Sequence, residues 1–270
     1  MGCAGPGGRP ARAPDAVRTL PNGLTVAVFE DNRQPLVQIQ LLVPAGSARE
    51  TGSESGLANL TFRMLGHGTA SRSSALYDEA VQALGGNVGG SVSREFATIN
   101  GAFLASDMEA GLELLADAVV NPLFGEDVLT QIKSQAQSGI ASARGNPATL
   151  ADDHLWGTTF GAHPYGHAAL GSPQALNGFS VAEVQAFHRR NYRPDRALLA
   201  IAGDVTPERA LKAATEQLGT WGGRAPEARR DSLPAVAGLR IRIVDAPSST
   251  ARSCGSAGSV RREAGPTTRR

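Results

Sequence analysis

The chain has 270 residues, of which 41% are hydrophobic and 19% charged, and its formal net charge is +1. A chain of this length and composition can bury a substantial core and predicts a globular protein with one large or two modest domains. A net charge this close to zero gives no reason to expect nucleic acid or an anionic membrane as a partner, because such binding depends on clustered positive charge.

Residues 1–17 are rich in glycine, proline and arginine, and they predict a disordered leader. No long apolar run occurs, so no transmembrane segment is expected. The opening letters MGCAGPGG also resemble the surroundings of a bacterial lipoprotein cysteine, which here would be Cys3. If the true start lies upstream of Cys3, we expect the bacterial periplasm or a membrane-tethered lipoprotein. Otherwise we expect the cytoplasm, so the compartment stays open.

The pattern of apolar residues predicts the first half of the chain as follows. Strands are expected at 24–29, after a Pro-Asn-Gly turn, and at 36–43. Helices are expected at 55–65 and 73–84, the second with Leu76, Ala80, Val81 and Leu84 on one stripe. That helix is expected to end at Gly85-Gly86, and the alternating segment from Asn87 to Ala105 predicts a hairpin.

The second half of the chain predicts mainly helices. They are expected at 107–119, 126–143, 148–160 and 180–190, followed by a buried strand in RALLAIAGDV and a helix whose N-cap is Thr206. Together the elements predict an α+β fold, with a mostly antiparallel sheet and helices packed on one side. We assign residues 18–225 to this domain.

A faint repeat follows the domain. GLRIRIVDAPSST, from Gly238, is similar in style to the strand segment that begins at Gly23, so residues 226–250 predict a linker and the start of a second copy. The last twenty residues, from Ala251, hold five arginines and only one large aliphatic residue, Val260. Such a segment predicts a disordered tail, either native, out of frame or the mark of a C-terminal truncation.

Several motifs in this order resemble the amino-terminal half of the M16 peptidase family, the pitrilysin, insulinase and mitochondrial-processing-peptidase group. They are LPNGLTVAVFED, VPAGSARE, SGLANLTFRMLGHGT, LGGNVGGSVSREFATI, NPLF, HPYGHAALGSPQAL, FHRRNYRPDRALLAIAGDV and LGTW. The resemblance covers about residues 18–250 and implies the M16, or LuxS-like metallohydrolase, half-domain architecture.

The resemblance also implies where a zinc site would lie. Active members carry His-x-x-Glu-His on the helix that matches residues 57–65, and this spacing places both imidazoles on one helical face. The three positions here are Asn59, Phe62 and Arg63, which are a poor ligand, a side chain that cannot move a proton, and a permanent cation. The third ligand of the family, a glutamate, falls around Gly139 and Ile140, and no glutamate occurs between Asp127 and Ala182. We therefore expect no catalytic residue, no metal site and no cofactor in this chain.

His163 and His167, in HPYGH, are the other candidate site residues. Their spacing would suit a metal on a helix, but Pro164 and Gly166 predict a turn, in which the two rings need not converge. The alternatives are a loop that closes against the rest of the domain and a metal site. We also consider that these two histidines, with the degenerate helix positions, face a cavity or a partner.

The resemblance implies a catalytically inactive M16 homologue that acts as the non-catalytic partner of a zinc-bearing M16 subunit, with a peptide substrate held jointly. Three alternatives remain: a zinc metalloendopeptidase in its own right, a structural core-type subunit, and a non-functional truncated fragment. The second half of family subunits supplies an Arg and a Tyr that hold substrate, and this contribution cannot be assigned to residues of this chain.

Overall fold

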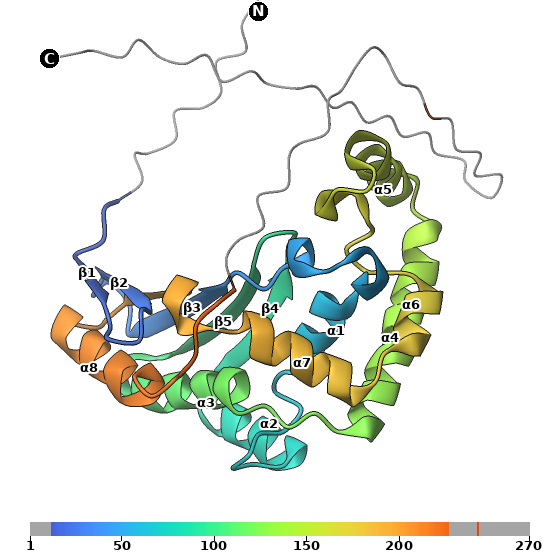
Figure 1. The fold of residues 1–270 in the computed structure, drawn as a ribbon. Coiled ribbons are helices and arrows are strands. Elements are labelled where there is room, and N and C mark those ends of the chain that lie inside the picture. The colour runs from blue at the N-terminus through green and yellow to red at the C-terminus, as the bar shows by residue number, and fades with distance from the viewer. Residues whose placement is uncertain (1–11, 227–241, 243–270) are drawn as a thin grey trace, which may run out of the picture.

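The computed structural model describes residues 12–226 and residue 242. Most of the predicted leader, the predicted second copy and the predicted tail from Ala251 therefore lie outside the described residues. The described part contains a six-stranded sheet and eight α-helices (Figure 1).

The sheet has the strand order β1-β2-β6-β3-β5-β4. Its strands are β1 (Ala16–Thr19), β2 (Thr25–Glu30), β3 (Leu36–Val43), β4 (Asn87–Val92), β5 (Ala97–Leu104) and β6 (Leu198–Gly203). Only β2 and β6 pair in parallel, and every other neighbouring pair is antiparallel. The prediction of a mostly antiparallel sheet is confirmed.

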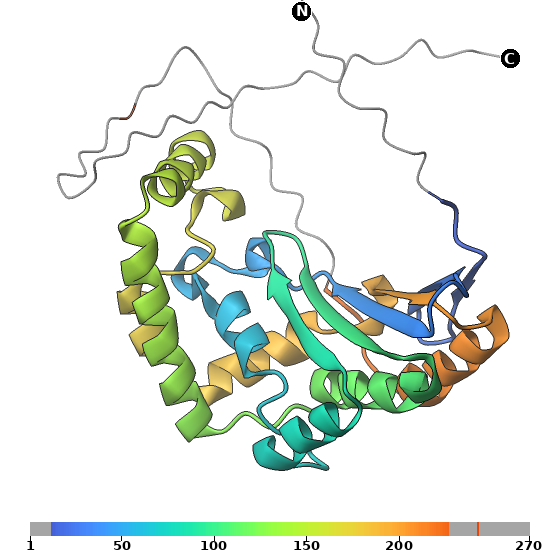
Figure 2. The same cartoon turned by 180° about the vertical axis from the view of Figure 1, so that it is seen from behind.

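The helices lie mainly on one side of the sheet and beyond its β4 end (Figures 1 and 2). They are α1 (Leu57–Met64), α2 (Ser74–Ala83), α3 (Met108–Val120), α4 (Glu126–Arg144), α5 (Pro147–Phe160), α6 (Pro173–Gly178), α7 (Val181–Asn191) and α8 (Pro207–Leu218). Helices α3 and α8 run beneath the strands, while α1 lies between β4 and α4 (Figure 2). The predicted α+β architecture, with helices on one side, is confirmed.

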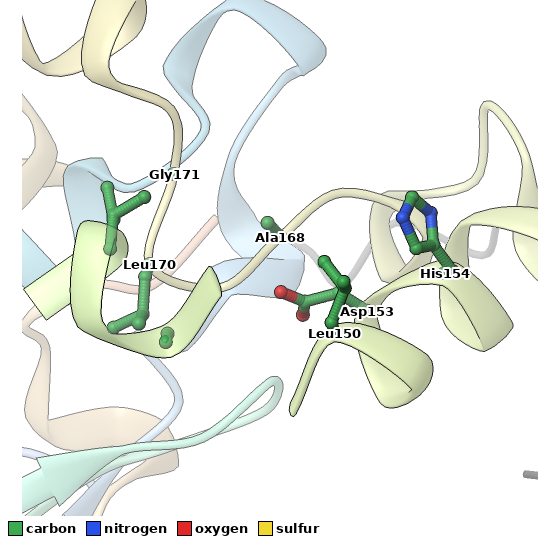
Figure 3. Close-up of a pocket in the computed structure, with 8 residues that line it drawn as sticks. Leu150, Asp153, His154, Ala168, Leu170 and Gly171 are labelled. Carbon is green, nitrogen blue, oxygen red and sulfur yellow. The ribbon is translucent and has the colours of Figure 1, made fainter. Parts of the chain in front are cut away.

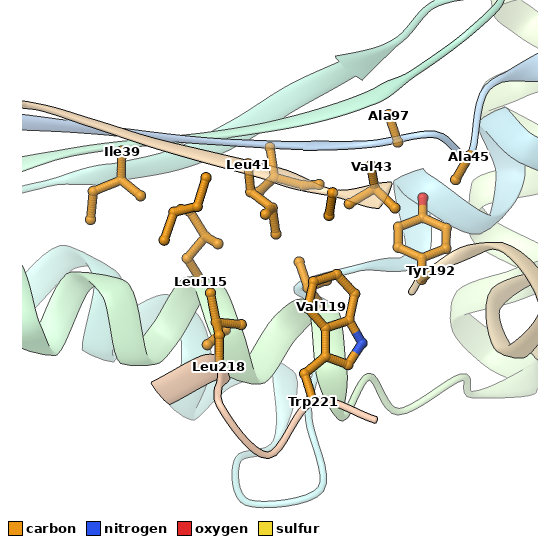
Figure 4. Packing of buried hydrophobic residues seen from close by; sticks show 14 of the residues in the cluster. Ile39, Leu41, Val43, Ala45, Ala97, Leu115, Val119, Tyr192, Leu218 and Trp221 are labelled. Atoms are coloured by element: carbon orange, nitrogen blue, oxygen red, sulfur yellow. The ribbon is translucent and has the colours of Figure 1, made fainter. Parts of the chain in front are cut away.

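The central strand β3 shows why the sequence folds this way. Successive side chains of a strand point to opposite faces, and β3 alternates between exposed and buried positions along its length. Val37, Ile39, Leu41 and Val43 are fully buried and pack on α3 and α8, together with Leu218 and Trp221 (Figure 4). The opposite face of β3 presents Gln38 and Gln40 to solvent. One face of the sheet is therefore the core, and the other is open in the described part of the chain.

Three details differ from the sequence-based expectations. Strand β1 begins at Ala16, inside the predicted leader, because it gains its order by pairing with β2 rather than from an apolar pattern of its own. The short helix α6 was not predicted, since six residues are too few for a helical period to be visible. On α2 the predicted Leu76 is exposed, and Tyr77 is buried in its place and donates to the carbonyl of Leu114.

The predicted helix ends are largely confirmed. Thr206 caps α8, with its side chain accepting a hydrogen bond from the backbone N–H of Arg209. Gly85 follows α2 with a φ of 59°, a conformation that glycine adopts without the steric cost of a side chain. None of the helices in the described residues is both long enough and apolar enough to cross a bilayer.

Candidate functional site

Helix α1 is the element on which the family motif would lie. Its buried face consists of Leu57, Ala58, Leu60, Thr61 and Met64, all of which pack into the core. The three degenerate motif positions, Asn59, Phe62 and Arg63, share the other face and are partly exposed. Residues three and four apart lie on the same side of a helix. Helix α1 lies between β4 and α4 (Figure 2), with Phe62 near β4 and Arg63 bonded to α4.

A buried carboxylate organises the N-terminal end of α1. The Oε1 of Glu50 accepts a hydrogen bond of 2.6 Å from the backbone N–H of Ala58, and its Oε2 accepts one of 3.1 Å from the N–H of Gly56. Glu50 is only 2% exposed. Desolvation raises the pKa of Glu50 to about 8, although the two N–H donors act in the opposite direction. The side chain thus satisfies donors at a helix N-terminus that would otherwise be buried without partners.

Gly56 is needed at this turn for two reasons. Its φ is +96°, a conformation that residues with a side chain rarely adopt, and a Cβ there would come within 2.9 Å of the Cα of Gly171. The start of α1 therefore lies in direct backbone contact with the 168–171 segment. This contact fixes α1 relative to the loop that carries His163 and His167.

His167 lies beside Glu50. Its Nδ1 is 3.5 Å from the Oε2 of Glu50 and 3.5 Å from the Oγ of Ser55, and its Nε2 is buried without a hydrogen-bond partner among the described residues. Burial lowers the pKa of His167, while burial raises the pKa of Glu50. Both shifts favour the uncharged forms, so this contact is a neutral polar pair rather than an ion pair near neutral pH.

His163 has different neighbours. Its Nδ1 accepts a hydrogen bond of 3.1 Å from the backbone N–H of Tyr165, and its ring packs against the rings of Tyr165 and Phe160. His167 therefore joins its loop to the segment that precedes α1, while these contacts of His163 stay within residues 160–165. In the described part of the chain, no group of three His, Cys, Asp or Glu residues is placed to hold a metal ion.

The three motif positions have contacts of their own. The ring of Phe62 lies over β4, where a Cβ on Gly90 would come within 2.9 Å of its Cζ. The Nη2 of Arg63 donates a hydrogen bond of 2.9 Å to the Oε1 of Gln135 on α4. Gln135 lies one helical turn before Gly139, and the family's third ligand is expected around Gly139 and Ile140, so α1 and α4 face each other near that position.

This donor set does not fit zinc. A tetrahedral zinc site needs imidazole, thiolate or carboxylate ligands, and Asn59 and Gly139 supply none of these. The Arg63 guanidinium adds a permanent positive charge at the same place. No step that depends on zinc can therefore be assigned to these residues.

A cavity of about 150 Å³ lies nearby, between α4, α5 and the 168–171 segment (Figure 3). Its lining is mostly apolar and includes Ile140, Leu150 and Leu170, with the carboxylate of Asp153 as a polar member. Burial raises the pKa of Asp153, and nearby Arg94 opposes that shift. The Arg94 guanidinium stacks on Trp156 of α5, 3.9 Å from the ring centroid, so the β4–β5 turn is held against this helix.

Strand β4 forms one edge of the sheet. Among the described residues it pairs with β5 alone, and α1 packs against it. A Cβ placed on Gly89 would meet no atom within 4 Å, so the space over the sheet is open at that position. An edge strand of this kind can accept an extended peptide as a further strand.

Sequence reasoning missed two residues that shape this site. Glu50 precedes α1 by seven positions and appears in the sequence as one more surface acid, because nothing in a local pattern marks a carboxylate that folds back under a helix. Gln135 appears as a polar position of α4, and only the packing of α1 on α4 reveals its bond to Arg63.

Comparison with known proteins places this geometry in context. Residues 25–172, more than half of the chain, match the model of the insulinase family, peptidase family M16, and residues 178–254 match the model of the peptidase M16 inactive domain. An uncharacterized zinc protease of Mycobacterium tuberculosis is 28% identical over 222 residues, which are 82% of this chain and 51% of the relative. A probable mitochondrial-processing peptidase subunit beta of Arabidopsis thaliana is 28% identical over 196 residues, which are 73% of this chain and 37% of the relative.

Solved structures agree with these matches. A peptidase M16 inactive domain from Pseudomonas fluorescens superposes with a TM-score of 0.74 at 27% identity, covering 78% of this chain and 52% of the other. A protease from Helicobacter pylori, at 19% identity, shares the fold with a TM-score of 0.73 over 82% of this chain and 53% of the other. The chain thus spans about half the length of the relatives it matches. It belongs to the M16 (insulinase) peptidase family.

Proposed function

We propose that this chain is a non-catalytic M16 protein that helps a zinc-bearing M16 subunit to hold a peptide substrate. The observation that carries the proposal is the hydrogen bond between Arg63 and Gln135. It joins α1 to α4 at one of the motif positions. The Arg63 cation and the neutral amide oxygen of Gln135 meet where active family members would carry ligands to a divalent cation. The helix of the family motif is present, but its side chains at these positions are not those of a zinc site.

Peptide holding is supported by the position of β4. This strand lies beside α1 at one edge of the sheet, where its outer backbone groups have no strand partner among the described residues. Strand addition draws affinity from backbone hydrogen bonds and therefore does not require a catalytic group. A bound peptide would pass the degenerate motif without being cleaved.

A partner is supported by the open face of the sheet. Its outward positions on β3, β5 and β6 carry no charged residue, and they include Leu36, Leu104 and Leu198, which are between 37% and 48% exposed. Uncharged surfaces with exposed leucines often mark contacts between proteins. The Arabidopsis relative carries the name of a subunit, which suits the same reading. We assign the face to contact with a zinc-bearing M16 subunit.

Co-expression with a zinc-bearing M16 protein of the same organism tests the partnership. Size-exclusion chromatography with light scattering should show one complex that contains both chains. Peptide cleavage by that complex should be abolished by changing the partner's glutamate base. A well-behaved monomer that ignores the co-expressed partner would refute the partnership, and cleavage by this chain alone would favour an independent metalloendopeptidase.

A further inference from the structure

Arg63 carries a charge that nothing near it balances. Within the described part of the chain its single side-chain hydrogen bond goes to the neutral Gln135, and no carboxylate lies within ion-pair distance. Arg72, Arg190 and Arg209, which are also on or near helices, each pair with a glutamate. A guanidinium has five N–H donors, so most of the binding capacity of Arg63 is unused.

The elements that pack against α1 offer no compensating charge. Helix α1 has no other ionisable residue, β4 has none, and the part of α4 after Asp127 has no acidic residue. On α7 the one carboxylate, Glu183, is bonded to Ser180 at that helix's own start. Glu50 and Glu54 lie at the opposite end of α1, where Glu50 caps the helix and Glu54 pairs with Arg190. The surface around Arg63 is therefore positive.

There is also room beside Arg63 for a ligand. A Cβ placed on Gly139, one turn along α4 from Gln135, would meet no atom within 4 Å. Asn59 lies one turn before Arg63 on the same face of α1, and its amide makes no hydrogen bond with other described side chains. The Asn59 amide is thus a second donor next to the Arg63 guanidinium. The open position at Gly139 leaves space beside both groups.

We propose that this surface selects peptides that carry a carboxylate, with Arg63 as the residue that binds it and Asn59 as an auxiliary donor. The inference rests on the proposed peptide-holding function and specifies its substrate class. A peptide added along β4 passes beside α1, and a glutamate or aspartate side chain, or a C-terminal carboxylate, would meet Arg63 there. Arginine binds carboxylates through two parallel N–H···O bonds, which gives the contact both strength and direction.

The test measures binding of fluorescent peptides to the full chain by anisotropy. The peptides share one uncharged, strand-forming sequence, and a single glutamate is moved along it, with glutamine at the same positions as the neutral set. At one register the glutamate peptide should bind about tenfold more tightly than its glutamine twin, the effect of one charge-assisted hydrogen bond. Arg63→Gln should remove this difference and leave the binding of the neutral peptides unchanged.

Arg33→Gln is the matched control, because Arg33 is exposed in the turn between β2 and β3 and its loss removes the same charge far from α1. This variant should keep the tenfold preference, and its melting curve and that of Arg63→Gln should match the wild type. Equal binding of glutamate and glutamine peptides by the wild type would overturn the inference and leave peptide holding intact. A preference that survives in Arg63→Gln would also overturn it, and no binding of any peptide would overturn both proposals.

Discussion

The two faces of helix α1 differ in how strictly the fold constrains them. On the buried face, Leu57, Leu60 and Met64 pack into the core, and Glu50 accepts a hydrogen bond from the N-terminal end of the helix. On the other face, Asn59 and Arg63 are partly exposed, and Arg63 bonds to Gln135 of α4. Packing therefore depends on the first face, and any chemistry depends on the second.

We expect the exposed face of α1 to tolerate substitutions that the buried face does not. Asn59, Phe62 and Arg63 are partly exposed, so substitutions at these positions should cost little stability. Changes on the buried face cost much more, because interiors are closely packed.

Leu60→Ala should have the largest effect. Leu60 is 1% exposed, and loss of its branched side chain leaves a cavity between α1 and the sheet. The free energy of unfolding should fall by about 3 kcal/mol, measured by urea denaturation. Asn59→Ala, one position earlier on the exposed face, is the control and should change it by less than about 0.5 kcal/mol. Equal losses in the two variants would contradict the contrast between the faces.

Glu50→Ala should have the next largest effect. The substitution leaves the buried N–H groups of Gly56 and Ala58 without an acceptor, at a cost of about 2 kcal/mol. Glu54→Ala is the control, since Glu54 is a more exposed acid of the same segment. Hydrogen exchange should show faster exchange at Ala58 in Glu50→Ala only. Unchanged protection there would mean that Glu50 is not the cap.

The same carboxyl predicts a smaller pH effect. The pKa of Glu50 is raised from 4.5 to about 8 in the folded chain. Its contribution to the free energy of unfolding is therefore fully present below pH 4.5 and is lost as the pH rises through 8. Burial lowers the pKa of His188 to about 4. His188 therefore makes the free energy of unfolding rise with pH, and it does so only below pH 6.5. Between about pH 6.5 and 8, stability should therefore decline in the wild type and stay nearly flat in Glu50→Gln. A flat wild-type curve would show that Glu50 is already ionised.

The sequence predicts the core better than the site, for physical reasons. Strands β2 and β3 and helices α3 and α8 have apolar periods that result directly from burial on one face. The alternation of β3 alone identifies Ile39 and Leu41 as core residues. Strand β1 depends on pairing with a distant segment, and local periodicity does not report such pairing.

At the site, the sequence indicates which residues stand at the motif positions but not what they contact. Asn59, Phe62 and Arg63 were identified from the resemblance, and the structure places them on one exposed face of α1. The bond from Arg63 to Gln135 joins residues 72 positions apart, and the contact of Glu50 with the start of α1 depends on a chain reversal at Gly56. Such contacts arise from tertiary packing and leave no local pattern.

The central claim, that the motif positions of this chain support no zinc chemistry, is tested most directly by elemental analysis together with a peptide-cleavage assay. The purified wild-type chain should hold no stoichiometric zinc and cleave nothing. The triple variant Asn59→His, Phe62→Glu, Arg63→His should remain inactive, because Gly139 still supplies no third ligand, while adding Gly139→Glu should produce a variant that retains zinc. One tightly held zinc per wild-type chain, lost in Arg63→Ala, would contradict the account.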